Sequence, residues 1–122
     1  MTKEKVIKLP IILSAKLTDE NKAAFEKAVE KGYIINKEGE EGKLTWQLSK
    51  TLLAYFCGRL FAGDYLRYSK SQKKYLWIKG KGKFPAIPLG DIFGVKTLKQ
   101  LRKKRLSLPS PNDHEIIDGL FS

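Results

Sequence analysis

The sequence lacks the residues from which disulfides and most metal sites are built. Its 122 residues include one cysteine and one histidine. A disulfide needs two cysteines and a zinc site needs several Cys or His ligands, so we expect no internal disulfide, no bound metal and no cofactor. Cys57 is predicted to be a small core side chain. His114, which stands between Asp113 and Glu115, is predicted to lie on the surface.

Long hydrophobic runs are also missing. The densest apolar segment, residues 44–61, is interrupted by Gly58 and Arg59 and is too short to span a bilayer. The first residues show no signal-peptide pattern. We therefore expect a cytoplasmic protein without a membrane partner.

Acidic side chains are scarce in one part of the chain. Residues 66–105 contain 13 Lys or Arg, and Asp91 is their single acidic residue. Residues 1–65 are nearly balanced, with 11 Lys or Arg and 9 Asp or Glu, whereas residues 106–122 carry three acidic and no basic residues. Such segregated charge is typical of a surface that meets a polyanion. We interpret residues 66–105 as a region that faces nucleic-acid phosphates; a solubilising face without a partner is the alternative.

The remaining composition indicates a single domain over residues 1–122. Hydrophobic residues make up 42% of the chain, which is enough for one sizeable core. A central core helix is predicted to begin at Ser49, whose hydroxyl can accept a first-turn N–H, and to end near Gly63. A second helix is predicted to begin at Thr18 and to end at Gly32.

The two ends of the chain are less regular. Residues 1–17 contain Pro10, which cannot donate to a β-ladder, so this part is expected to be a flexible or edge segment or, alternatively, a tail that caps the core. Residues 113–121 carry apolar side chains that are expected to fold back on the core. A dimer contact is the alternative use of this short apolar end.

The basic region is predicted to hold a β-hairpin and a helix-turn-helix-like unit. Residues 74–88 indicate the hairpin, because Gly80 and Gly82 allow a tight tip. A short helical turn over residues 89–93, Gly94 as its stop and a capped helix over residues 97–105 follow, which is the pattern of a helix-turn-helix. The predicted fold class is therefore mainly α within α+β: a small helical domain with a helix-turn-helix-like C-terminal half and one basic β-hairpin.

The candidate nucleic-acid contacts come from the helix over residues 97–105 and from the expected hairpin tip. Leu98 and Leu101 are predicted to point inward and the polar residues outward. Arg and Lys suit phosphates and guanine edges, and Gln suits adenine. The candidate binding residues are Lys79, Lys81, Lys83, Lys96, Lys99, Gln100, Arg102, Lys103 and Arg105.

No catalytic constellation is apparent, and the chain is not expected to be an enzyme. Asp64 and Asp91 could serve as paired carboxylates that hold a metal for nuclease chemistry. Each fits a turn or a helix cap better, because aspartate oxygens accept nearby backbone N–H groups.

A resemblance to a known family covers residues 44–121. The order W-x-x-S-K-x-x-L-x-Y at residues 46–55, then IFGVKTLKQLRKKR, then EIIDGLF is similar to the C-terminal region of RteC-type regulators from Bacteroides conjugative elements. The resemblance implies a small helical DNA-binding or transcription-regulating protein of a mobile element.

These observations favour a DNA-binding regulatory protein that contacts phosphates and a groove through the basic helix and hairpin. The first alternative is a non-catalytic structural or interaction module that meets an acidic protein or forms a homodimer. RNA binding is the third interpretation, with four aromatic residues as stacking surfaces or, alternatively, as core: Tyr65, Tyr68, Tyr75 and Trp77.

Overall fold

Helix α3 (Lys50–Cys57) runs through the centre of the molecule and continues into a short π-helical segment, η1 (Gly58–Ala62). The structure, a computed structural model, describes residues 7, 9–40 and 42–121. The Ser49 hydroxyl accepts the Leu52 N–H at 3.2 Å, and every α3 side chain from Leu52 onward is buried. The predicted central core helix is therefore confirmed.

Gly63 ends this central element. Its φ of 76° lies in the left-handed region, which glycine adopts without the steric cost that a Cβ would bring. The predicted stop near Gly63 is confirmed, and the chain turns directly into the next strand.

Helix α2 (Asp19–Glu30) also begins and ends where the sequence predicts. The Thr18 hydroxyl accepts the Asn21 N–H at 3.2 Å, and Gly32 follows the helix with a φ of 79°. Its buried face consists of small and aromatic side chains, Ala24, Phe25 and Ala28.

The N-terminal segment contains one short helix. Helix α1 (Ile11–Ser14) follows Pro10, and Leu9, Leu13 and Leu17 are buried in the core. Three leucines anchor this part to the core, so the alternative of a tail that caps the core holds here and the expectation of a flexible or edge segment is wrong. Residues 1–6 and 8, which belong to the same expectation, lie outside the described residues.

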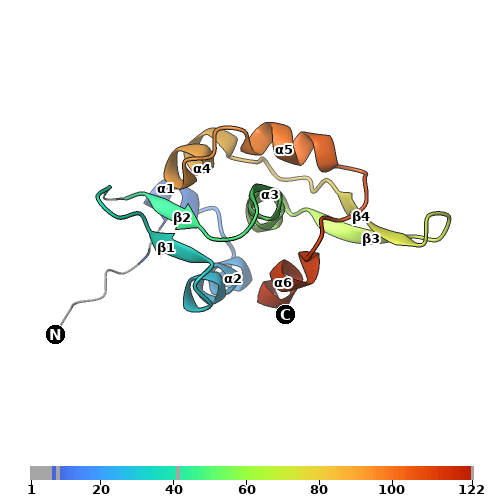
Figure 1. Cartoon of the computed structure of the whole chain (residues 1–122), viewed down its shortest axis with the longest axis horizontal. Coiled ribbons are helices and arrows are strands. Elements are labelled where there is room, and N and C mark those ends of the chain that lie inside the picture. Colours follow the sequence, from blue (N-terminus) through green and yellow to red (C-terminus); the bar gives the residue numbers. More distant parts are fainter. Residues whose placement is uncertain (1–6, 8, 41, 122) are drawn as a thin grey trace.

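Two antiparallel hairpins flank the helices (Figure 1). Strands β1 (Ile34–Asn36) and β2 (Leu44–Trp46) form the first, with Ile34 opposite Trp46. Strands β3 (Tyr65–Ser69) and β4 (Lys74–Ile78) form the second, which projects from one end of the molecule. Its other edge is extended by Ser107, whose N–H donates to the Trp77 carbonyl at 2.7 Å.

The hairpin predicted over residues 74–88 is therefore wrong in its register. Strand β4 pairs with β3, the strand that precedes it in the chain. Strand β3 lies in a segment that was expected to be a polar connection. Residues 79–85, expected to form the tip and the second strand, form an irregular loop. The turn lies between β3 and β4, where Lys73 has a φ of 55°. In this pairing Leu66 lies opposite Trp77 and Tyr68 opposite Tyr75. The glycines of the loop serve another purpose, described below.

The C-terminal half contains a helix-turn-helix-like pair. Helix α4 (Ala86–Phe93) ends at Gly94, whose φ is 67°, and α5 (Leu98–Arg105) follows after a short turn. The first helix of the pair is longer than the predicted turn at residues 89–93. Thr97 precedes α5 as predicted, although its side chain makes no capping hydrogen bond.

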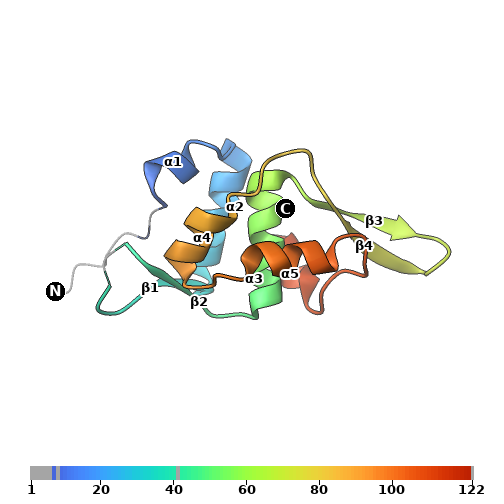
Figure 2. The same ribbon diagram turned by 90° about the horizontal axis from the view of Figure 1, so that it is seen from above.

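Helix α3 lies between α5 on one side and α6 (His114–Asp118) on the other, as Figures 1 and 2 both show. A 3-10 turn, η2 (Gly119–Phe121), ends the described chain. Ile117 and Leu120 are buried, so the predicted return of this end to the core is confirmed. The described residues contain no helix that combines the length and the apolar composition needed to cross a membrane.

Candidate nucleic-acid interface

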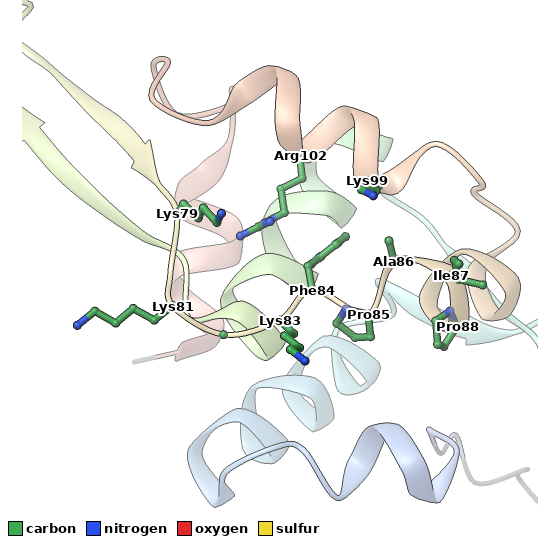
Figure 3. Close-up of a pocket in the computed structure, with 11 residues that line it drawn as sticks. Lys79, Lys81, Lys83, Phe84, Pro85, Ala86, Ile87, Pro88, Lys99 and Arg102 are labelled. Carbon is green, nitrogen blue, oxygen red and sulfur yellow. The ribbon is translucent and has the colours of Figure 1, made fainter.

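The loop over residues 79–85 and the first turn of α4 face α5 across an open groove of about 670 Å³ (Figure 3). We call it the basic groove. It is lined by Lys79, Lys81, Gly82, Lys83, Phe84, Pro85, Ala86, Ile87, Pro88, Lys99 and Arg102. None of these lining residues is acidic. A cleft lined by one sign of charge concentrates counter-ions, so this groove attracts anions.

Five predicted contact residues line this groove, although they come from separate segments; four of them are exposed lysines, and the fifth, Arg102, is buried. Lys79, Lys81 and Lys83 are exposed, and Figure 3 shows their side chains leaving the loop in different directions. Lys99 is exposed on the facing helix. The fold therefore joins the two parts of the candidate site that lie apart in the sequence.

A second, smaller hollow of about 280 Å³ lies between α4 and α5. Lys96, Lys99 and Gln100 line it and are exposed, as predicted. Asp91 lines it as well, and its backbone carbonyl accepts a hydrogen bond from Lys43 at 3.1 Å. Lys99 belongs to both hollows, so the basic groove continues into this one.

The loop is held by a buried carboxylate. Asp64 is only 3% exposed. Its Oδ1 accepts the Gly80 N–H at 2.7 Å and Arg102 Nη2 at 2.6 Å, and its Oδ2 accepts Trp77 Nε1 at 2.9 Å and Arg102 Nε at 2.7 Å. We call these four residues the Asp64 cluster. It ties β4, the loop and α5 to the end of the central helix.

The charge of Asp64 is maintained by its partners. Burial alone raises the pKa of a carboxyl group, because water no longer solvates the anion. The hydrogen bonds from Arg102, Gly80 and Trp77 outweigh burial, so the pKa of Asp64 lies below its usual range. The carboxylate is therefore ionised at neutral pH and forms a charged pair with Arg102.

Glycine is required at two points of this contact. A Cβ at Gly80 would overlap the Ala62 carbonyl oxygen, and a Cβ at Gly58 would overlap the Asp64 carboxylate. Gly82 adds a backbone bond, because its N–H donates to the Ala62 carbonyl at 2.9 Å. In the segment Lys-Gly-Lys-Gly-Lys the glycines thus dock against the end of the π-helical segment, and the lysines between them remain exposed.

Arg102 was predicted to face a nucleic-acid groove, and this prediction is wrong. Arg102 is 8% exposed, and its guanidinium lies 4.9 Å from the centre of the Phe84 ring as well as against Asp64. The reason is helical periodicity: position 102 lies four residues after the buried Leu98 and so on the same face. Its role is to position the loop.

Arg105 is also not on the outer face. It is half-buried, its Nη2 donates to the Pro109 carbonyl at 3.3 Å, and its buried Nε has no hydrogen-bond partner among the described residues. Lys103 is exposed on α5 as predicted but lies outside the two hollows. Lys104, which the sequence-based set omits, is exposed too.

The aromatic residues divide between surface and core. Trp77 is fully buried, so it is a core residue and not a stacking surface. Tyr65, Tyr68 and Tyr75 are exposed, and the rings of Tyr68 and Tyr75 pair edge to face with centroids 5.1 Å apart.

The suggested carboxylate pair does not form as a metal site would require. Asp64 is occupied by Arg102, and Asp91 is exposed on α4. Among the described residues, no three His, Cys, Asp or Glu side chains gather into a cluster that could hold a metal.

A second carboxylate cluster fixes the C-terminal helix. Asp118 Oδ1 accepts Tyr55 OH and Arg59 Nη1, both at 2.5 Å, and its Oδ2 lies 2.7 Å from His114 Nδ1. We call these residues the Asp118 cluster. His114 is therefore half-buried, which corrects the expectation of a surface histidine.

Cys57 is buried as predicted, and burial raises the pKa of its thiol.

The arrangement as a whole offers ammonium groups and an exposed helix face to a polyanion. No family model, curated protein or solved structure matches the chain. Ile87 and Phe84 were not predicted as groove residues, because both were assigned to the expected hairpin. The buried position of Arg102 was available from its spacing to Leu98.

Proposed function

We propose that this protein binds duplex DNA, with the basic groove on the phosphates and the exposed face of α5 toward a DNA groove. One observation carries the proposal: three lysines of the loop and Lys99 of α5 line the same groove, and none of the residues that line it is acidic. Lysine ammonium groups neutralise phosphates and release their counter-ions, which drives binding.

DNA is favoured over RNA because of the helix pair. In a helix-turn-helix the second helix enters the major groove, and here the corresponding helix exposes Lys99, Gln100 and Lys103. These side chains can reach phosphates and base edges. The major groove of RNA is too deep and narrow for such a contact.

A regulatory role in a mobile element is part of the proposal. The resemblance of residues 44–121 to RteC-type regulators supports it, and so does the segregation of charge in the sequence. A cytoplasmic location goes with this role.

The proposal is tested by fluorescence anisotropy with a short duplex of random sequence at several salt concentrations. Binding at low salt should be micromolar or tighter. The logarithm of the association constant should fall with the logarithm of the salt concentration, by about 0.9 for each phosphate neutralised. Absence of binding at low salt would contradict the proposal.

A matched pair of triple variants locates the contact. Replacing the three loop lysines by Gln should weaken binding and reduce the slope by about 2–3, since each lost phosphate contact removes about 0.9. The control replaces three exposed lysines at or near α2, which removes the same charge elsewhere. Equal effects of the two triples would mean that the basic groove is not the binding site. The test triple is Lys79, Lys81 and Lys83, and the control triple is Lys16, Lys22 and Lys31.

A further inference from the structure

An apolar side chain stands in the middle of the cationic face. Ile87, in the first turn of α4, is 80% exposed and lines both the basic groove and the smaller hollow beside it. Lys99 on α5 also lines both, and Figure 3 shows the two residues on facing helices. Ile87 therefore lies where the proposed interface passes from loop to recognition helix.

The fold does not require an isoleucine at this position. Helix α4 buries its other face against the core, through Leu89, Ile92 and Phe93, and leaves Ile87 in solvent. A phosphate contact does not require it either, because ammonium groups supply that attraction. An exposed branched side chain that has lysines on its groove side, with Asp91 in the smaller hollow, suits a partner that is apolar at one point and anionic beside it.

We propose that Ile87 contacts the 5-methyl group of thymine in the major groove of bound duplex DNA. The thymine methyl is the apolar group that base pairs present in that groove, and apolar side chains read it by contact. Neighbouring donors complete the surface, since Lys99 and Gln100 line the hollow beside Ile87. This inference rests on the proposed function and adds a base preference to it.

The experiment compares two duplex pools of the same random sequences, one with thymine and one with uracil at every thymine position. Uracil lacks only the 5-methyl group. The wild-type protein should bind the thymine pool about two- to fourfold more tightly, because burying one methyl group contributes up to about fourfold in affinity. The variant Ile87→Ala should bind both pools equally.

A control variant, Ile12→Ala, removes the same side chain from helix α1, where Ile12 is 74% exposed. It should keep the wild-type preference for thymine. Thermal unfolding of both variants should match the wild type, because both side chains lie in solvent. A binding change in Ile87→Ala then reports a lost contact and not a lost fold.

Each other outcome has a distinct meaning. If the wild type binds both pools alike with a steep salt dependence, the phosphate interface stands and the thymine contact is wrong. A thymine preference that survives in Ile87→Ala, with wild-type affinity for both pools, assigns the contact to another side chain and overturns the inference. Equal weakening of both pools by Ile87→Ala would indicate insertion between bases, which also overturns it. No binding of either pool would contradict the proposed function itself, and the thymine contact with it.

Discussion

The molecule contains two aspartates that each receive an arginine and an aromatic donor, and they lie in different environments. The Asp64 side chain is 0% exposed and that of Arg102 is 10% exposed. The Asp118 side chain is 29% exposed and that of Arg59 is 24% exposed. A single arrangement of groups thus occurs once inside the protein and once near its surface.

The two clusters are neighbours across the core. Tyr55 donates to Asp118 and Trp77 donates to Asp64, and these two rings contact each other edge to face with centroids 5.2 Å apart. The Asp64 cluster joins segments that build the basic groove, whereas the Asp118 cluster attaches α6 to α3 and η1. Because an unpaired charge costs far more in the interior than in contact with water, the two should differ in how much the fold depends on them.

The largest effect is expected for Asp64→Asn. This change leaves the buried Arg102 guanidinium without its counter-charge, and breaking a buried pair typically costs about 3–5 kcal/mol. Urea unfolding measures the loss in free energy of unfolding. The control is Asp91→Asn at an exposed position of α4, for which a change within about 0.5 kcal/mol is expected. A similar small change for Asp64→Asn would contradict the structural role of the cluster.

Gly80→Ala tests the loop side of the same cluster. The added methyl group would collide with the Ala62 carbonyl, so the loop must shift, at a cost of about 1–3 kcal/mol. Gly119→Ala is the matched control, because a Cβ there meets nothing within 4 Å. Unfolding free energies and duplex affinity should fall together for Gly80→Ala only. If both variants behave alike, the close approach of the loop does not matter.

A smaller effect is expected at the Asp118 cluster. Asp118→Asn removes the charge but keeps an acceptor for Tyr55, and half-exposed pairs contribute little, so the loss should be about 1 kcal/mol. Urea unfolding again gives the number, and duplex binding should be unchanged. A loss as large as that of Asp64→Asn would abolish the distinction between the two environments.

The last comparison concerns the pH dependence of stability. The lowered pKa of Asp64 means that its stabilisation is complete above the ordinary Asp pKa of about 3.9 and is lost as the pH falls through the folded-state value. Burial, followed by the hydrogen bond to Asp118, raises the pKa of Tyr55, so its stabilisation is complete below about pH 10 and is lost at higher pH.

Midpoints of thermal unfolding against pH should therefore separate the two clusters. In Asp64→Asn the unfolding midpoint should decrease less than in the wild type as the pH falls below about 4. In Tyr55→Phe it should decrease less than in the wild type as the pH rises above about 10. The profile of each variant should otherwise run parallel to that of the wild type. Unaltered acid and alkaline limbs in the two variants would show that these groups do not govern the pH dependence.

The sequence predicts those parts of the fold that local rules decide. The caps at Thr18 and Ser49 and the stops at Gly32, Gly63 and Gly94 all lie where their residue types indicate. Each depends on contacts within a few residues, so a single sequence contains the information.

Long-range contacts explain most of the errors. The loop glycines look like a hairpin tip, but the Gly80 N–H is taken by Asp64, which lies before the hairpin in the chain. Nothing near residues 79–83 signals that partner. The error at Arg102 has another source: its charge suggested the outer face, although its spacing from Leu98 placed it on the inner one.

The charged residues of the candidate site could be predicted from the sequence, whereas its apolar residue, Ile87, could not. The lysines of the groove follow from the one-sided composition of residues 66–105. Ile87 could not be recognised, because exposure of an isoleucine depends on which face of α4 meets the core, and the helix was predicted to begin later.

The way in which the loop over residues 79–85 is held has a consequence for the entropy of binding. A glycine-rich basic segment normally keeps many backbone conformations in the free protein and loses them when a partner binds. In this protein the N–H groups of Gly80 and Gly82 are already bonded to Asp64 and Ala62. The backbone is ordered when the chain folds, so a ligand has only the lysine side chains left to immobilise. The groove is thus a fixed template for its partner, unlike a basic tail that acquires its shape on contact.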